Sequence, residues 1–169
     1  MKNIRLIILL KLFIILIVAF GISYARNDIR ADYILVEKEK RTLALFSHNK
    51  EIRRYKISLG GDTKGHKEKE GDEKTPEGIY TIDYRVSNSK FHRALHISYP
   101  NEQDIEHAKE NNVSPGGDIM IHGIKNGFGW IGRLHRFIDW TDGCIAVSNK
   151  EIEEIWSLVP DGTAIEIKP

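Results

Sequence analysis

The sequence predicts a mainly β domain with two short helices. Apolar and polar side chains alternate over several short runs, which is the period of a β-strand. Polar or glycine-rich turns separate these runs, and only two stretches show the longer apolar period of a helix. The predicted strands are three runs within residues 32–60 and the runs 79–86, 93–100, 116–123 and 163–167.

The two predicted helices cover residues 102–112 and 148–159. The first ends at paired asparagines, which commonly terminate helices. The second begins with Ser148 and Glu151 at capping-box spacing. Its apolar stripe consists of Ile152, Ile155 and Trp156. The charged, glycine-rich stretch 60–78 is predicted to be a surface loop, either simply solvated or part of a loop that flanks a binding groove.

The N-terminus has the pattern of an export signal. A short basic segment precedes the apolar run "LFIILIVAFGI", residues 12–22, and "SYA" then offers a cleavage site after Ala25. We therefore predict a signal peptide at 1–25 and an exported domain at 32–169, in the periplasm or cell envelope. The alternative is that residues 6–22 remain as an uncleaved membrane anchor.

The charge of the exported part argues against a nucleic-acid partner. The chain has 25 basic and 24 acidic residues, and its first 25 residues hold three of the basic ones and no acid. The remainder therefore carries 22 basic against 24 acidic side chains. Such a near-neutral domain lacks the basic face that nucleic-acid binding requires.

A single cysteine, Cys144, lies in "DWTDGCIAVSN", residues 139–149. One cysteine cannot form an internal disulfide, and a free thiol outside the cytoplasm is exposed to oxidation. The residue is either a small buried apolar side chain or a functional thiol.

A thiol nucleophile needs a base and donors for an oxyanion. His122, which ends the run "IMIH" beside Gly123, is the leading candidate for the base. Gly143 permits a tight turn in which its N–H and that of Cys144 converge. His135, nine residues before Cys144, is a rival base. Each of these residues also has an ordinary structural interpretation.

These motifs together resemble the L,D-transpeptidase catalytic domain (YkuD-type) family. Eighteen residues, 123–140, separate His122 of "IHG" from Thr141 of "TDGCIAV", and "TPEG" stands upstream. "HISYPN", "PGGDIMIHG" and the whole cysteine segment resemble the exported, proteobacterial-type subgroup. Asp142 replaces the usual histidine of the motif, and Ala146 stands where arginine or asparagine is common. The resemblance covers 32–169.

The resemblance implies a β-sandwich-like fold and acyl transfer on peptidoglycan stem peptides without metal or cofactor. Cys144 would form a thioester at the carbonyl between a diamino acid and D-alanine. His122 would be base and then acid, and the Gly123 carbonyl would orient its ring. An amine from another stem, a D-amino acid, a lipoprotein lysine or water would resolve the thioester. We assign the substrate-binding set as Thr141, Asp142, Trp140, His135 and Tyr99.

Several alternatives stay open. The same thioester would serve a stem-peptide hydrolase, such as an L,D-carboxypeptidase or a lipoprotein-releasing amidase. A non-catalytic wall-binding module is a further possibility, and His96, His122, His135 and Cys144 could in principle form a zinc set. We expect partial thiolate character at Cys144, although the Asp142 carboxylate opposes it. The sequence does not predict the oligomeric state.

Overall fold

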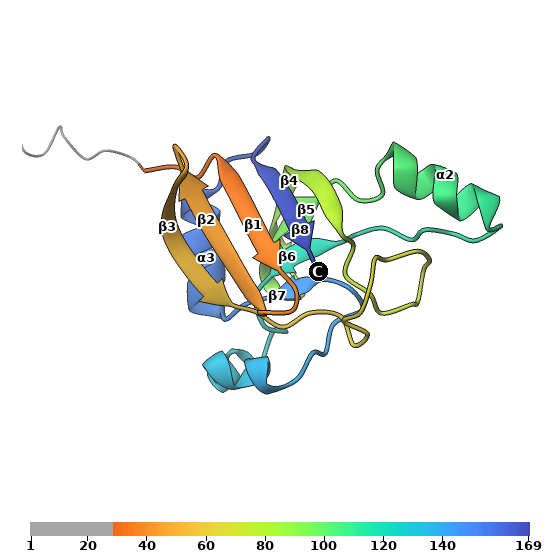
Figure 1. The fold of residues 1–169 in the computed structure, drawn as a ribbon. Helices are drawn as coiled ribbons and strands as arrows, with labels where there is room; N and C mark the ends of the chain where they lie inside the picture. Colours follow the sequence, from red (N-terminus) through yellow and green to blue (C-terminus); the bar gives the residue numbers. More distant parts are fainter. Residues whose placement is uncertain (1–28) are drawn as a thin grey trace, which may run out of the picture.

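The structure, a computed structural model, describes residues 29–169 and contains one continuous eight-stranded sheet in that range. The strand order is β3-β2-β1-β8-β4-β5-β6-β7. The mainly β prediction is therefore confirmed (Figure 1). The elements are β1 Tyr33–Glu37, β2 Thr42–Ser47, β3 Lys50–Lys56, β4 Gly78–Ser89, β5 His92–Ile97, α2 Glu102–Glu110, β6 Met120–His122, η1 Gly129–Phe137, β7 Ile145–Ala146, α3 Asn149–Leu158 and β8 Ala164–Lys168.

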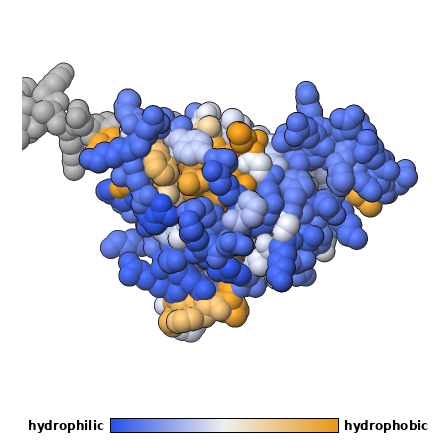
Figure 2. Space-filling model, in the orientation of Figure 1, coloured by the Kyte–Doolittle hydropathy of each residue, from blue (hydrophilic) through white to orange (hydrophobic). Residues whose placement is uncertain are grey.

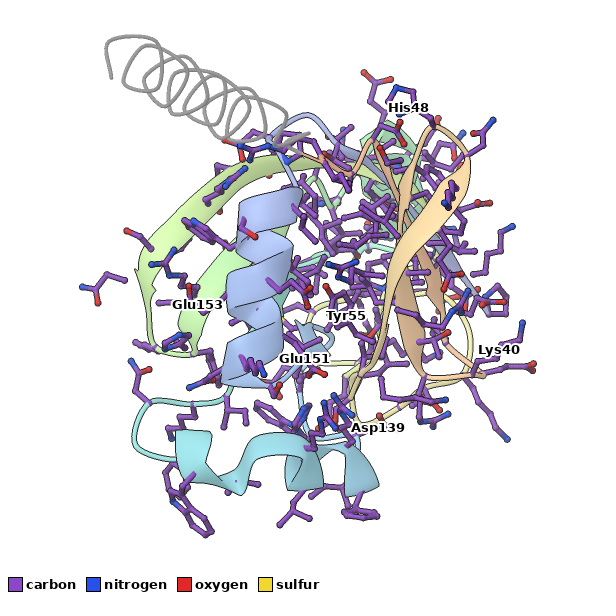
Figure 3. All side chains as sticks on the ribbon, turned by 90° about the vertical axis from the view of Figure 1, so that its left-hand side faces the viewer. Lys40, His48, Tyr55, Asp139, Glu151 and Glu153 are labelled. Carbon is purple, nitrogen blue, oxygen red and sulfur yellow. The ribbon has the colours of Figure 1, made fainter. Side chains whose placement is uncertain are left out.

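The long strand β4 joins the two halves of the sheet. Its first part, 78–81, pairs with β8, and its later part pairs with β5 across two register shifts. Irregularities of this kind bend a strand and increase its twist. The sheet curls in consequence, and α3 lies between the β4–β5 hairpin and strands β1–β3 (Figure 3).

The core fills the inside of this curl. In β1 the side chains alternate between half-buried and fully buried, with Ile34 and Val36 turned inward. The parallel pairing of β1 with β8 sets Ile34 beside Ile165 and Val36 beside Ile167. These apolar pairs stabilise the centre of the sheet because burying each such side chain removes it from water.

The prediction for the second helix is confirmed in detail. Glu151 accepts hydrogen bonds from the Ser148 N–H (3.0 Å) and hydroxyl (2.6 Å), as its capping-box spacing suggested. Ile152 and Ile155 are fully buried, and Trp156 packs on the same core. Helix α2 is capped by Asn101, whose side chain accepts from the amides of Gln103 and Asp104.

Three elements differ from the sequence-based prediction. The strand expected at 116–123 shortens to Met120–His122, and the two-residue β7 was not foreseen. The 3-10 segment η1 was missed because it begins without a side-chain cap at Phe128, and Gly132 (φ 53°) interrupts it. Among the described residues, no helix is long and apolar enough to cross a membrane. The predicted signal peptide at 1–25 lies outside them.

Candidate active site

Strands β6 and β7 bring His122 and Cys144 to one part of the sheet. They pair in parallel, with Ile121 opposite Ile145 and His122 opposite Ala146. Cys144 directly precedes β7, two residues before the partner of His122. Because side chains alternate along a strand, His122 and Cys144 belong to the same face of this pair.

His122 is held in one tautomer. Its Nδ1 lies 2.6 Å from the Gly123 carbonyl, and a carbonyl can only accept, so Nδ1 carries the proton and Nε2 is left free. The side chain is buried, and its ring packs against Phe91 and Trp140, with centroids 4.5 and 5.8 Å away. Burial lowers the pKa of His122 to about 4, although the Gly123 bond opposes this shift. The imidazole is therefore neutral near pH 7.

The position of Gly123 requires glycine. A Cβ there would lie 2.8 Å from Asn149 Oδ1 and 3.0 Å from the Phe91 carbonyl. Any side chain would push these groups away and disturb the backbone that holds His122.

The thiol of Cys144 is half-buried and protonated at rest. Its sulfur donates to the Asp118 carbonyl at 3.6 Å. Burial raises the pKa of the thiol to about 11; the Met120 amide and Lys67 act against this, whereas the carboxylates of Asp142 and Asp118 add to it. The expected partial thiolate character is therefore wrong for the resting protein, because desolvation outweighs the groups that favour the anion.

The turn before Cys144 is tightly constrained. Gly143 has φ +121°, and a Cβ there would lie 2.5 Å from the Lys74 carbonyl, so only glycine fits. Thr141 is buried; its hydroxyl donates to the Cys144 carbonyl (2.7 Å) and accepts from the Gly143 N–H (3.3 Å). Thr141 thus braces the turn in place of the predicted substrate contact. The Gly143 bond is long for N–H···O, so the oxyanion role of that amide stays a prediction.

His135, the rival base, is buried and also packs against Trp140. Its Nδ1 lies 3.1 Å from the Ser58 hydroxyl, and its ring meets Trp140 edge-on at 6.5 Å. Burial lowers the pKa of His135, and Arg136 lowers it further. Nε2 of His135 and Nε1 of Trp140 are buried without a hydrogen-bond partner among the described residues. Trp140 therefore contacts both histidine rings.

A charged cavity of about 350 Å³ lies beside the thiol. Asp118, Asp142 and the buried Lys67 contribute charge to it. Nζ of Lys67 donates to Asp72 at 2.7 Å and to the Lys69 carbonyl at 2.9 Å. The sequence singled out only Asp142 here. Lys67 comes from the loop 60–78, and no local sequence pattern predicts that this lysine is buried near the cysteine turn.

Tyr99 and His96 have structural partners. Tyr99 is buried, and its hydroxyl donates to the Pro115 carbonyl at 2.9 Å, so the structure places it in the core and not on a substrate surface. His96 bonds Asp83 at 2.7 Å and stacks on Tyr84. Within residues 29–169 no group of three or more His, Cys, Asp or Glu side chains could hold a metal.

The model of the L,D-transpeptidase catalytic domain (YkuD) matches residues 31–167. The chain belongs to this family. It is also 32% identical, over 133 residues, to the Escherichia coli (strain K12) protein named "Putative L,D-transpeptidase YafK". That match covers 75% of this chain and 46% of YafK.

Two solved structures are similar to this chain in fold and, more weakly, in sequence. The helical cell shape determining protein Pgp2 of Campylobacter jejuni has a TM-score of 0.64 and 26% identity, covering 84% of this chain and 49% of that one. Bd1075 of Bdellovibrio bacteriovorus has a TM-score of 0.58 and 28% identity, covering 85% and 49%. The chain thus spans about half the length of these relatives.

Proposed function

We propose that this domain is a cysteine-dependent L,D-transpeptidase of the cell envelope that acts on peptidoglycan stem peptides in wall crosslinking or remodelling. The observation that carries the proposal is the fixed tautomer of His122, whose free Nε2 belongs to the same face of β6 and β7 as the lone thiol. The relationship to a protein named for determining cell shape supports a role in the wall.

In the acylation step, the Cys144 sulfur attacks the carbonyl carbon between the diamino acid and D-alanine. With a thiol pKa of about 11 and a histidine pKa of about 4, a resting thiolate–imidazolium pair is unfavourable. The thiol proton therefore moves to His122 Nε2 as the C–S bond forms. Backbone N–H groups at Cys144 and Gly143 would stabilise the oxyanion. His122 then protonates the leaving amine, the C–N bond breaks, and D-alanine departs.

In the second step, an amine attacks the thioester and transfers its proton to His122. The tetrahedral intermediate collapses, the C–S bond breaks, and the sulfur takes the proton back. With water as acceptor the same sequence gives a hydrolase. The Gly123 carbonyl holds Nδ1–H throughout and stabilises the imidazolium, as a carboxylate does in other triads.

The test is mass analysis of wall fragments incubated with the purified domain and with Cys144→Ser. A crosslink between two diamino acid residues, or an exchanged terminal residue, supports the transpeptidase. A shortened stem without exchange assigns the domain as a hydrolase. Unchanged fragments under all conditions would instead favour a non-catalytic wall-binding module.

A further inference from the structure

The segment 128–138 places large apolar side chains on the surface. Trp130 is 80% exposed and Phe137 83% exposed. Figure 2 shows the resulting patch at the lower edge of the molecule, where η1 lies in Figure 1. This apolar patch consists of Phe128, Trp130, Leu134, Phe137 and Ile138. Contiguous exposed surface of this kind marks an interaction site in an otherwise polar protein.

The apolar patch is also hollowed. A cavity of about 360 Å³ opens between η1 and Trp140. Its lining is almost wholly apolar, with Lys125 and His135 as the polar exceptions. The proposed acyl transfer uses none of these side chains directly, and only Trp140 touches its machinery, through a ring contact with His122.

The charged side chains that the patch segment itself contributes are basic, and Asp139, directly after it, is paired with Arg41. Residues 119–138 contain three basic side chains and no acidic one. Arg136 is paired with Glu151, but Lys125 and Arg133 form no ion pair with any described residue. Exposed aromatic side chains flanked by free cations are suited to the boundary between anionic headgroups and acyl chains.

We propose that the apolar patch docks this domain onto an anionic lipid surface, with Trp130 and Phe137 inserted at the interface and Lys125 and Arg133 near the headgroups. The proposal rests on the export included in the proposed function. A protein partner is less favoured because the most exposed side chains protrude from a short irregular segment and the free charges beside them are all positive.

The docking surface is remote from the start of the described chain. The Ala31 N–H donates to the Leu158 carbonyl at the end of α3, whereas Arg136 contacts Glu151 in its first turn. Leu158 lies seven residues after Glu151, which corresponds to about 10 Å along the helix axis. The surface therefore fits the form released by cleavage after Ala25 and supplies an attachment that does not use residues 6–22.

The first test is co-sedimentation of residues 26–169 with vesicles. This product retains the described sheet and the whole core cluster at 31–167, which is also the stretch that the family model matches. The vesicles are phosphatidylcholine, alone or mixed with phosphatidylglycerol. Trp130→Ser with Phe137→Ser should weaken binding at least about tenfold. The control pair Ile79→Ser with Ile105→Ser, also exposed, should bind like the parent.

The charges are tested in the same assay. Lys125→Gln with Arg133→Gln should weaken binding to the mixed vesicles about tenfold and change binding to neutral ones little. Lys50→Gln with Lys64→Gln, exposed lysines outside the apolar patch, is the matched control. Acyl-chain bromination should quench Trp130 emission, and the quenched component should disappear in Trp130→Phe.

The outcomes separate this proposal from the catalytic one. Cys144→Ser should bind vesicles normally, and Trp130→Ser with Phe137→Ser should process soluble stem fragments at the parental rate. Absence of vesicle binding, or equal loss in patch and control variants, overturns the proposal. Concentration-dependent dimers that the patch variant abolishes, without vesicle binding, would assign the surface to a second copy instead.

Discussion

Two cavities of nearly equal volume adjoin the candidate active site, and their linings differ in chemistry. The one beside Cys144 is lined by Lys67, Asp118 and Asp142, whereas the one under η1 is lined mostly by aliphatic and aromatic side chains. His122 is connected to both regions. Its ring contacts Trp140, which lines the apolar cavity, and its strand β6 pairs with β7, which begins directly after Cys144. The comparison suggests a division of roles under the two proposals: the charged side would receive a peptide with free amino and carboxyl groups, and the apolar side would dock the domain.

The largest effect should come from the thiol itself. Cys144→Ser should lower turnover by at least about 10³-fold, because an alkoxide forms far less readily than a thiolate. A carbapenem should add to the native domain through its strained carbonyl and should not add to the variant, as intact-mass measurement would show. Full activity of the serine variant without an adduct on the native protein would rule out the nucleophile assignment.

Replacing His122 should slow acylation much more than replacing His135. His122→Ala should slow acylation by about 10² to 10⁴, the usual worth of a general base. His135→Ala should cost about tenfold, because it acts only through Trp140 and Ser58. Single-turnover acylation across pH measures both.

His107→Ala, an exposed histidine on α2, is the matched control. If His135→Ala loses the rate while His122→Ala keeps it, their roles are reversed. If both behave like the control, neither histidine is the base.

The sequence singles out the candidate catalytic pair but not the residues that surround it. His122, Gly123, Gly143 and Cys144 lie in short motifs whose glycines meet local steric demands, which a sequence records directly. The neighbours of the thiol come from distant segments: Lys67 from a loop, and Asp118 from before β6. Their approach depends on how the sheet closes, so no spacing rule reveals it.

The dependence on distant contacts also explains why the predictions for Thr141, Tyr99 and η1 differ from the structure. Residue type made Thr141 and Tyr99 plausible substrate contacts, but burial decided that each bonds a backbone carbonyl. The strands and α3 were predictable because alternation and capping are local signals. Segment 129–137 has Trp130, Leu134 and Phe137 at helical spacing but no side-chain cap, and Gly132 interrupts it, so its conformation depends on packing against the rest of the fold.

Burial of neutral histidine should also make the fold sensitive to acid. The pKa of His122 falls from 6.5 to about 4 on folding. Between these pH values the unfolded chain binds a proton at this histidine and the folded chain does not. Its contribution is complete above pH 6.5 and is lost as pH falls to about 4. The loss is roughly 3 kcal/mol at about 1.4 kcal/mol per pKa unit. Urea unfolding from pH 7 to 4 measures it, and His122→Asn should show a shallower decline. Parallel curves for both proteins would contradict the shift.

The smallest effect, and the one that best tests the charged cavity, should come from Asp142. Its carboxylate raises the pKa of the Cys144 thiol, so Asp142→Asn should lower that pKa and speed alkylation at pH 8 a few-fold. The gain stays modest because Asp142 is exposed and screened by water and salt. Glu106→Gln, an exposed acid on α2, should change nothing. If Asp142 also attracts the amino group of a substrate, the same variant will need more stem peptide for half-maximal rate despite its more reactive thiol. Faster alkylation together with a higher stem-peptide concentration at half-maximal rate would assign both effects to the Asp142 carboxylate. An unchanged alkylation rate would show that the Asp142 carboxylate does not contribute to the thiol pKa.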